Sequence, residues 1–114
     1  MSLVYKIVSA AEWRSAETAG AFHGAGVDLK DGYIHFSTAE QVAETVAKWF
    51  AGRDDLVLVA VETEPLGDAL RWEPSRNRAL FPHLYAALPM SAVRWSRRLP
   101  IKADGVHDFG ALEA

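Results

Sequence analysis

Cysteine is absent from this chain of 114 residues. The absence excludes disulfides, thiolate metal sites and a cysteine nucleophile. An excess of basic charge is also missing, because the formal net charge is −3, and we therefore do not expect nucleic-acid binding. No apolar run is long enough to cross a bilayer and neither end carries a charged-then-apolar leader, so the expected location is the cytoplasm.

Several sequence motifs for catalysis are missing as well. There is no Gly-x-Ser-x-Gly elbow for a serine nucleophile and no glycine loop with the spacing of a phosphate site. Two histidines and a carboxylate, here His35, His83 and Glu73, are the minimum set for a catalytic zinc or iron site. No short chelating pair accompanies them, and Arg71 beside Glu73 would repel a cation. We therefore expect no bound metal.

The hydrophobic pattern predicts one α+β domain, with a core over residues 3–100 and a surface tail over residues 101–114. Its sheet is expected to be mixed and mostly antiparallel, with two main helices. Strands are predicted at residues 3–8, 33–36, 56–61, 70–73, 81–85 and 92–99. Helices are predicted at residues 10–18 and 38–51, after capping boxes that begin at Ser9 and Ser37, and residues 21–30 are expected to form an irregular loop.

Three of the short predicted strands each carry two polar side chains two residues apart. Because side chains alternate along a strand, each pair lies on one face. The pairs are His35 with Ser37, Arg71 with Glu73, and His83 with Tyr85, and Tyr33 shares the face of the first pair. This recurrence predicts a polar cleft built on a sheet. Arg76, in the loop that follows Glu73, either is solvated or holds a phosphate at the mouth of the cleft.

Structural roles compete with this interpretation at every position. A histidine in a strand is commonly a hydrogen-bonded structural residue. Arg71 and Glu73 would also suit an ion pair at a sheet edge, and Tyr33 and Tyr85 would suit the rim of a core. Pro82 places His83 near an edge, which favours a ligand-facing role for that histidine.

The motifs together resemble a known family. They are Tyr5-Lys6-Ile7, Trp13, Asp31-Gly32-Tyr33-Ile34-His35-Phe36-Ser37-Thr38, Asp55-Leu56-Val57-Leu58, Leu70-Arg71-Trp72-Glu73 and Phe81-Pro82-His83-Leu84-Tyr85. Over residues 3–110 the chain is similar to the domain-of-unknown-function family numbered 952. That family consists of small bacterial and plant proteins without an established activity.

A second resemblance concerns the His-x-Ser pattern at the end of a strand. It is similar to the first motif of the ADP-ribosyltransferase superfamily and implies an ADP-ribosyltransferase-like fold with NAD as cofactor. The resemblance implies that His35 positions the ribose and that Tyr85 or Tyr33 stacks on the nicotinamide. Glu73 would be the carboxylate that stabilises the ribose in the transition state. The chain lacks a Gln/Glu-x-Glu motif, and Glu73 precedes the His83 motif.

These observations lead to one expected function and one alternative. The cleft is expected to bind a small anionic or nucleotide-like molecule, with catalysis by His35, Glu73 and His83 in an NAD-dependent transfer. Tyr33, Ser37, Arg71, Arg76 and Tyr85 would then bind the ligand. The alternative is a non-catalytic module that binds a ligand or a protein. The sequence does not indicate the oligomeric state.

Overall fold

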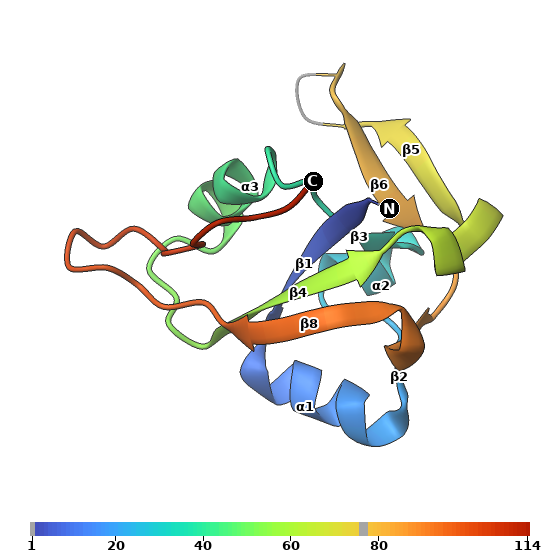
Figure 1. Ribbon diagram of the computed structural model, residues 1–114, viewed down its shortest axis with the longest axis horizontal. Helices are drawn as coiled ribbons and strands as arrows, with labels where there is room; N and C mark the ends of the chain where they lie inside the picture. Colours follow the sequence, from blue (N-terminus) through green and yellow to red (C-terminus); the bar gives the residue numbers. More distant parts are fainter. Residues whose placement is uncertain (1, 76–77) are drawn as a thin grey trace.

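The computed structural model describes residues 2–75 and 78–114, and it confirms the α+β class (Figure 1). One sheet has the order β1-β4-β8, a second β3-β6-β5, and β2 pairs with β7. The strands are β1 (Leu3–Ser9), β2 (Ala21–Phe22), β3 (Ile34–His35), β4 (Leu56–Glu62), β5 (Leu70–Pro74), β6 (Leu80–Leu84), β7 (Leu88–Pro89) and β8 (Val93–Arg98). The helices are α1 (Ala10–Ala19), α2 (Val27–Asp31) and α3 (Val42–Trp49), with 3₁₀ turns η1 (Glu64–Ala69) and η3 (Met90–Ala92).

The two central strands, β1 and β4, are buried on both faces. Val4, Val8 and Val59 lie in a core cluster with Trp13 of α1. The alternate residues of the same strands lie in a second cluster with Val46 of α3. This two-sided burial explains why residues 56–61 form a continuous apolar run and do not alternate with polar residues.

The strands form three antiparallel sheets in place of the single mixed sheet that was predicted. The reason lies at Ser37, which forms one isolated bridge to Tyr5 of β1. Tyr5 N–H donates to Ser37 O at 2.7 Å, and Ser37 N–H donates to Tyr5 O at 2.9 Å. On the N-terminal side of this bridge β3 pairs with β6 and not with β1, so the two sheets separate.

The helix boundaries differ from the prediction at α3. Ser9 caps α1 as predicted, accepting from Glu12 N–H at 3.1 Å. The second capping box begins at Thr38 and not at Ser37: Gln41 N–H donates to Thr38 Oγ1 at 3.2 Å, and Thr38 N–H donates to Gln41 Oε1 at 3.0 Å. Ser37 is therefore not committed to a helix cap.

The predicted irregular loop at residues 21–30 contains the short strand β2 and the helix α2. Two glycines, Gly24 and Gly26, concealed this helix from pattern analysis, which reads glycine as a breaker. Gly32, at φ 85°, ends α2 in the left-handed conformation that glycine tolerates best. The Asp28 carboxylate accepts from Ala25 N–H at 3.1 Å and so fixes the first turn of α2.

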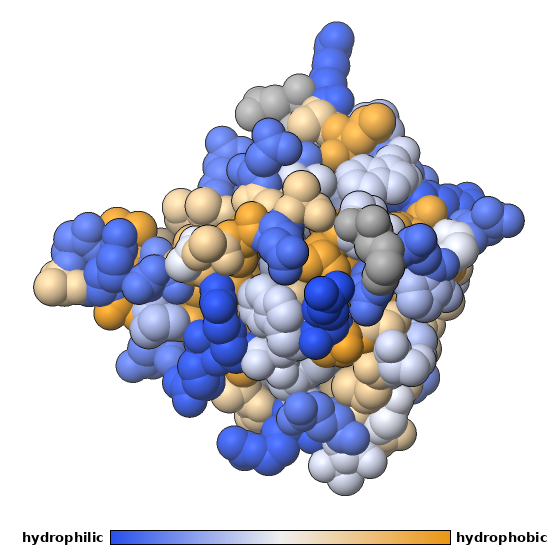
Figure 2. Space-filling model, in the orientation of Figure 1, coloured by the Kyte–Doolittle hydropathy of each residue, from blue (hydrophilic) through white to orange (hydrophobic). Residues whose placement is uncertain are grey.

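The C-terminal segment lies over α3 and the second core cluster (Figure 1). Most of it is exposed, but Phe109 and Leu112 pack against that cluster, and His107 is buried. On the face drawn in Figure 2, hydrophobic and hydrophilic residues are interspersed. Within the described residues, no helix has the length and apolar character needed to span a membrane.

Candidate functional site

One face of the β3-β6-β5 sheet carries most of the predicted site residues. His83 of β6 lies opposite His35 of β3 and opposite Arg71 of β5. Residues directly opposite in antiparallel strands point to the same side of the sheet. Glu73, two residues after Arg71, lies on that side as well. The structure thus brings together His35, Arg71, Glu73 and His83 from three strands.

Glu73 forms a hydrogen-bonded group with His83 and Tyr85. His83 Nδ1 lies 2.8 Å from Glu73 Oε1, and Tyr85 O–H donates to the same oxygen at 2.7 Å. These bonds, first from Tyr85 and then from His83, lower the pKa of the Glu73 carboxyl, while Glu73 raises the pKa of the Tyr85 phenol. A carboxylate only accepts, so Nδ1 of His83 carries a proton.

The ring of Tyr33 joins the two histidines. Its centroid lies 4.6 Å from that of His35, 4.3 Å from that of His83 and 5.1 Å from that of Tyr85. The Arg71 guanidinium lies over the ring of Tyr85, with its Cζ 4.9 Å from the centroid of that ring. Stacking of this kind holds the rings at fixed angles.

His35 is held by two carboxylates. Its Nδ1 lies 2.7 Å from Asp28 Oδ1, and its Nε2 lies 2.9 Å from Asp31 Oδ2. Each ring nitrogen therefore lies within hydrogen-bond distance of a carboxylate oxygen. The two histidines of the site therefore differ, because both nitrogens of His35 are engaged by the protein.

Asp28 and Lys6 form a buried ion pair next to His35. Lys6 Nζ lies 2.8 Å from Asp28 Oδ2, and the side chains are 9% and 1% exposed. Burial lowers the pKa of Lys6, although the Asp28 charge opposes the shift. Burial alone would raise the pKa of Asp28, but the bonds from His35 and Lys6 outweigh it and lower that pKa to about 2.

The acid sensitivity of the fold follows from Asp28. A carboxyl whose pKa falls from 3.8 to about 2 on folding stabilises the protein above its unfolded value, and the contribution is lost as the pH drops through the folded value. We expect Asp28 to account for about 2 kcal/mol of the stability lost between about pH 5 and pH 2. Urea denaturation across this range measures the loss. The slope should be clearly smaller in Asp28→Asn, and an equal slope in both proteins would contradict the assignment.

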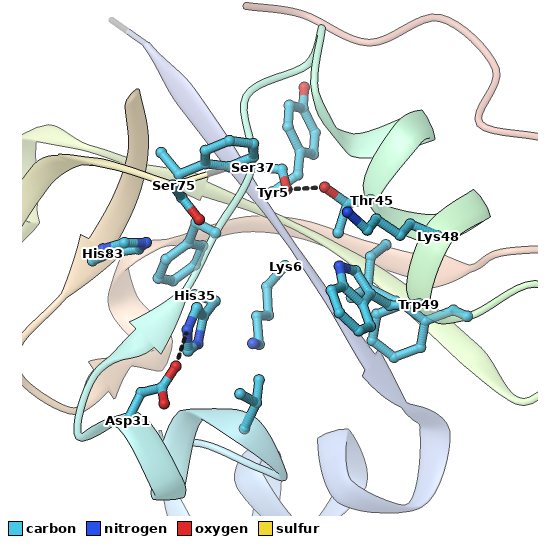
Figure 3. Close-up of a pocket in the computed structure, with 15 residues that line it drawn as sticks. Tyr5, Lys6, Asp31, His35, Ser37, Thr45, Lys48, Trp49, Ser75 and His83 are labelled. Atoms are coloured by element: carbon cyan, nitrogen blue, oxygen red, sulfur yellow. Dashed lines mark hydrogen bonds and ion pairs between the residues drawn. The ribbon is translucent and has the colours of Figure 1, made fainter. Parts of the chain in front are cut away.

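A cavity of about 480 Å³ opens beside this network (Figure 3). Below the Tyr5–Ser37 bridge, β1 and β3 diverge, and the cavity occupies the space between them. Its polar groups include Lys6, Asp31, His35, Ser37, Thr45, Lys48, Ser75 and His83, and its aromatic wall includes Phe36, Trp49, Phe50 and Phe81. His83, His35 and Ser37 are therefore both predicted site residues and cavity-lining residues.

Four other predicted residues lie outside the cavity lining. They are Tyr33, Arg71, Glu73 and Tyr85; Glu73 bonds to His83, and the ring of Tyr33 packs against that of His83. Arg76 lies outside the described residues. Ser37 is 5% exposed, and its hydroxyl lies 3.0 Å from Thr45 Oγ1.

Several residues of the site were not predicted from the sequence, notably Lys6, Asp28 and Asp31. Lys6 left a signal, because it stands in an otherwise apolar strand, and a lysine is almost never buried unless it is paired. Asp28 and Asp31 lie in the segment whose helix was not recognised. Trp72, the neighbour of Glu73 in β5, is 46% exposed and lies on the opposite face of that strand.

No group of three or more histidine and carboxylate side chains suited to a metal ion occurs among residues 2–75 and 78–114. Several atoms that could ligate a metal already bond to protein partners. His35 is bound to two aspartates, and Glu73 accepts from His83 and Tyr85.

Comparison with known proteins places the chain in a family. Residues 7–96 match the family model described as "Protein of unknown function (DUF952)". The chain belongs to this family. No curated protein matches it. Neither this comparison nor the following structural one supports the similarity to ADP-ribosyltransferases.

Solved structures of another protein, CC0527 from Caulobacter crescentus, are similar to this DUF952 chain. The crystal structure shares 54% sequence identity, with 94% of each chain covered and a TM-score of 0.89. The solution structure shares 56% identity, covers 93% of this chain and 91% of that one, and has a TM-score of 0.83. These matches support the fold and leave the function open.

Proposed function

We propose that this DUF952 protein binds a small molecule with a flat apolar part and an anionic group in the cavity between β1 and β3. The observation that carries the proposal is the cavity itself, with its volume of about 480 Å³ and its aromatic wall. Small-molecule sites typically measure about 300–1,000 Å³ and combine apolar walls with a few polar groups. This cavity has both features.

The α3 side of the cavity suits a flat ring beside an anion. Trp49 lines the cavity and is 67% exposed, so a ligand in the cavity can reach its ring. Lys48 Nζ lies 5.5 Å from the centroid of Trp49 and makes no ion pair with any residue that the structure describes. An ammonium group in this position attracts a carboxylate or phosphate. A nucleotide-like molecule meets both requirements.

NAD-dependent transfer has weaker support than binding. The resemblance to ADP-ribosyltransferases requires His35 to hold a ribose, yet both ring nitrogens of His35 already bond to aspartates. It also requires a carboxylate at the reacting carbon, yet Glu73 accepts two protein hydrogen bonds and is not part of the cavity lining. We therefore propose binding as the function and keep NAD as one ligand to be tested.

Thermal-shift measurements with nicotinamide mononucleotide, NAD, ADP-ribose, AMP and inorganic phosphate test the proposal. A ligand at a hundred times its dissociation constant should stabilise the protein by about 2.7 kcal/mol. A shift with inorganic phosphate would indicate simple anion binding, whereas a shift with the nucleotides and not with phosphate would indicate recognition of the ring. If no nucleotide or other flat anion raises the melting temperature at millimolar concentration, the proposed ligand class is wrong.

Two exposed tryptophans provide a matched pair of variants. Trp49→Ala should weaken binding of a stabilising ligand by about tenfold or more, because loss of base stacking costs about 1–3 kcal/mol. Trp72→Ala should leave affinity unchanged, because Trp72 is 46% exposed and does not line the cavity. Isothermal titration calorimetry of both variants measures the difference. Equal affinities would place the ligand elsewhere.

A further inference from the structure

The two histidines that line the cavity are bonded differently. His83 is 3% exposed and uses Nδ1 to donate to Glu73. Its other nitrogen, Nε2, has no hydrogen-bond partner within residues 2–75 and 78–114, and the ring stands at the cavity wall with an edge toward the interior (Figure 3). His35 lacks such a nitrogen, because both of its nitrogens bond to aspartates.

The bond to Glu73 determines which nitrogen of His83 carries the proton. When the ring is neutral, a proton on Nδ1 leaves the lone pair on Nε2. Tyr85 donates to the same carboxylate oxygen and holds it in place, and the ring of Tyr33 packs 4.3 Å from the imidazole. A histidine oriented in this way by a carboxylate is the arrangement that general-base catalysis uses.

We propose that His83 is a general base in this cavity and that Glu73 is the residue that positions it. The inference deepens the proposed function, on which it rests: the bound molecule, or a water molecule beside it, presents a hydroxyl group to Nε2. The O–H bond breaks, the proton forms an N–H bond with Nε2, and the electron pair stays on oxygen. The Glu73 carboxylate offsets the charge of the resulting imidazolium.

Hydrolysis of p-nitrophenyl acetate by the whole protein tests the base without the natural ligand. Water attacks the ester carbonyl, gives its proton to Nε2, and p-nitrophenolate leaves with the electron pair of the C–O bond, so acetic acid is the other product. His83→Ala should reduce the protein-dependent rate by about tenfold or more. His23→Ala, which removes an exposed histidine outside this cavity, should stay within about twofold of the unmodified protein.

Glu73→Gln tests the positioning role through the pH profile of the same reaction. Without the carboxylate, imidazolium is less stable, so the midpoint of the rate profile should move to lower pH while the maximal rate falls. A merely structural Glu73 would lower the amount of folded protein and leave the midpoint in place. An unchanged midpoint would therefore overturn its positioning role.

Nitrogen NMR of the unmodified protein supplies a measurement that does not depend on any variant folding. The neutral His83 ring should carry its proton on Nδ1, with Nε2 giving the resonance of an unprotonated nitrogen. The opposite tautomer, or equal rates for His83→Ala and His23→Ala, would overturn the proposal. If the tautomer and the loss of rate are as expected but no ligand binds, only the proposed function is contradicted.

Discussion

Replacement of Asp28 by asparagine should lower the free energy of unfolding by about 3–5 kcal/mol, the usual cost of leaving a buried charge without its partner. Lys6 would lose the partner of its ammonium group in a site where its side chain is 9% exposed. The bond from His35 Nδ1 would lose its charged acceptor at the same time. Urea denaturation at neutral pH, followed by tryptophan fluorescence, measures the change.

Two comparisons separate this effect from a general loss of charge. Asp31→Asn removes a carboxylate that is 36% exposed and, within residues 2–75 and 78–114, forms a side-chain bond only to His35, so it should cost about 1 kcal/mol or less. Lys6→Met in the Asp28→Asn background removes the unpaired ammonium and should recover part of the loss. If Asp28→Asn and Asp31→Asn cost the same, the buried pair does not stabilise the fold as we infer.

The main features of the fold could be predicted from the sequence, because they follow from local patterns. The apolar run from Leu56 predicts a central strand with both faces covered, and Ser9 with Glu12 marks the start of α1. Helix α2 could not be predicted in this way. Gly24 and Gly26 precede it, and what fixes its first turn is the Asp28 carboxylate, a bond that is visible only in three dimensions.

The candidate site, like the fold, could be predicted only where it follows from local patterns. Two-residue spacing places Arg71 with Glu73 on one face, and the strand register then brings that face against His83. Spacing within one strand says nothing about which strands are neighbours, so the contact between His83 and Glu73 was not available from the sequence. The cavity could not be predicted from the sequence, because it exists only where β1 and β3 separate after the bridge between Tyr5 and Ser37.

Replacement of His35 by alanine should cost about 2 kcal/mol of stability, because hydrogen bonds to charged groups contribute about 1.5–3 kcal/mol. The change removes the bonds from the His35 ring to Asp28 and to Asp31. His83→Ala should also cost about 2 kcal/mol, because its side chain is 4% exposed and its ring packs 4.3 Å from the ring of Tyr33. Thermal and urea denaturation of the two variants measure both costs.

Stability and hydrolysis rate together decide what each histidine does. Loss of stability without loss of p-nitrophenyl acetate hydrolysis in His35→Ala, and loss of that hydrolysis in His83→Ala, would make His35 the structural histidine and His83 the reactive one. A transferase of the ADP-ribosylating kind needs the reverse, since its histidine on the first motif must face the ligand. If His35→Ala is as stable as the unmodified protein and abolishes a ligand-induced thermal shift, the ligand displaces the bonds of His35 to Asp28 and Asp31. The roles inferred for the two histidines would then be wrong.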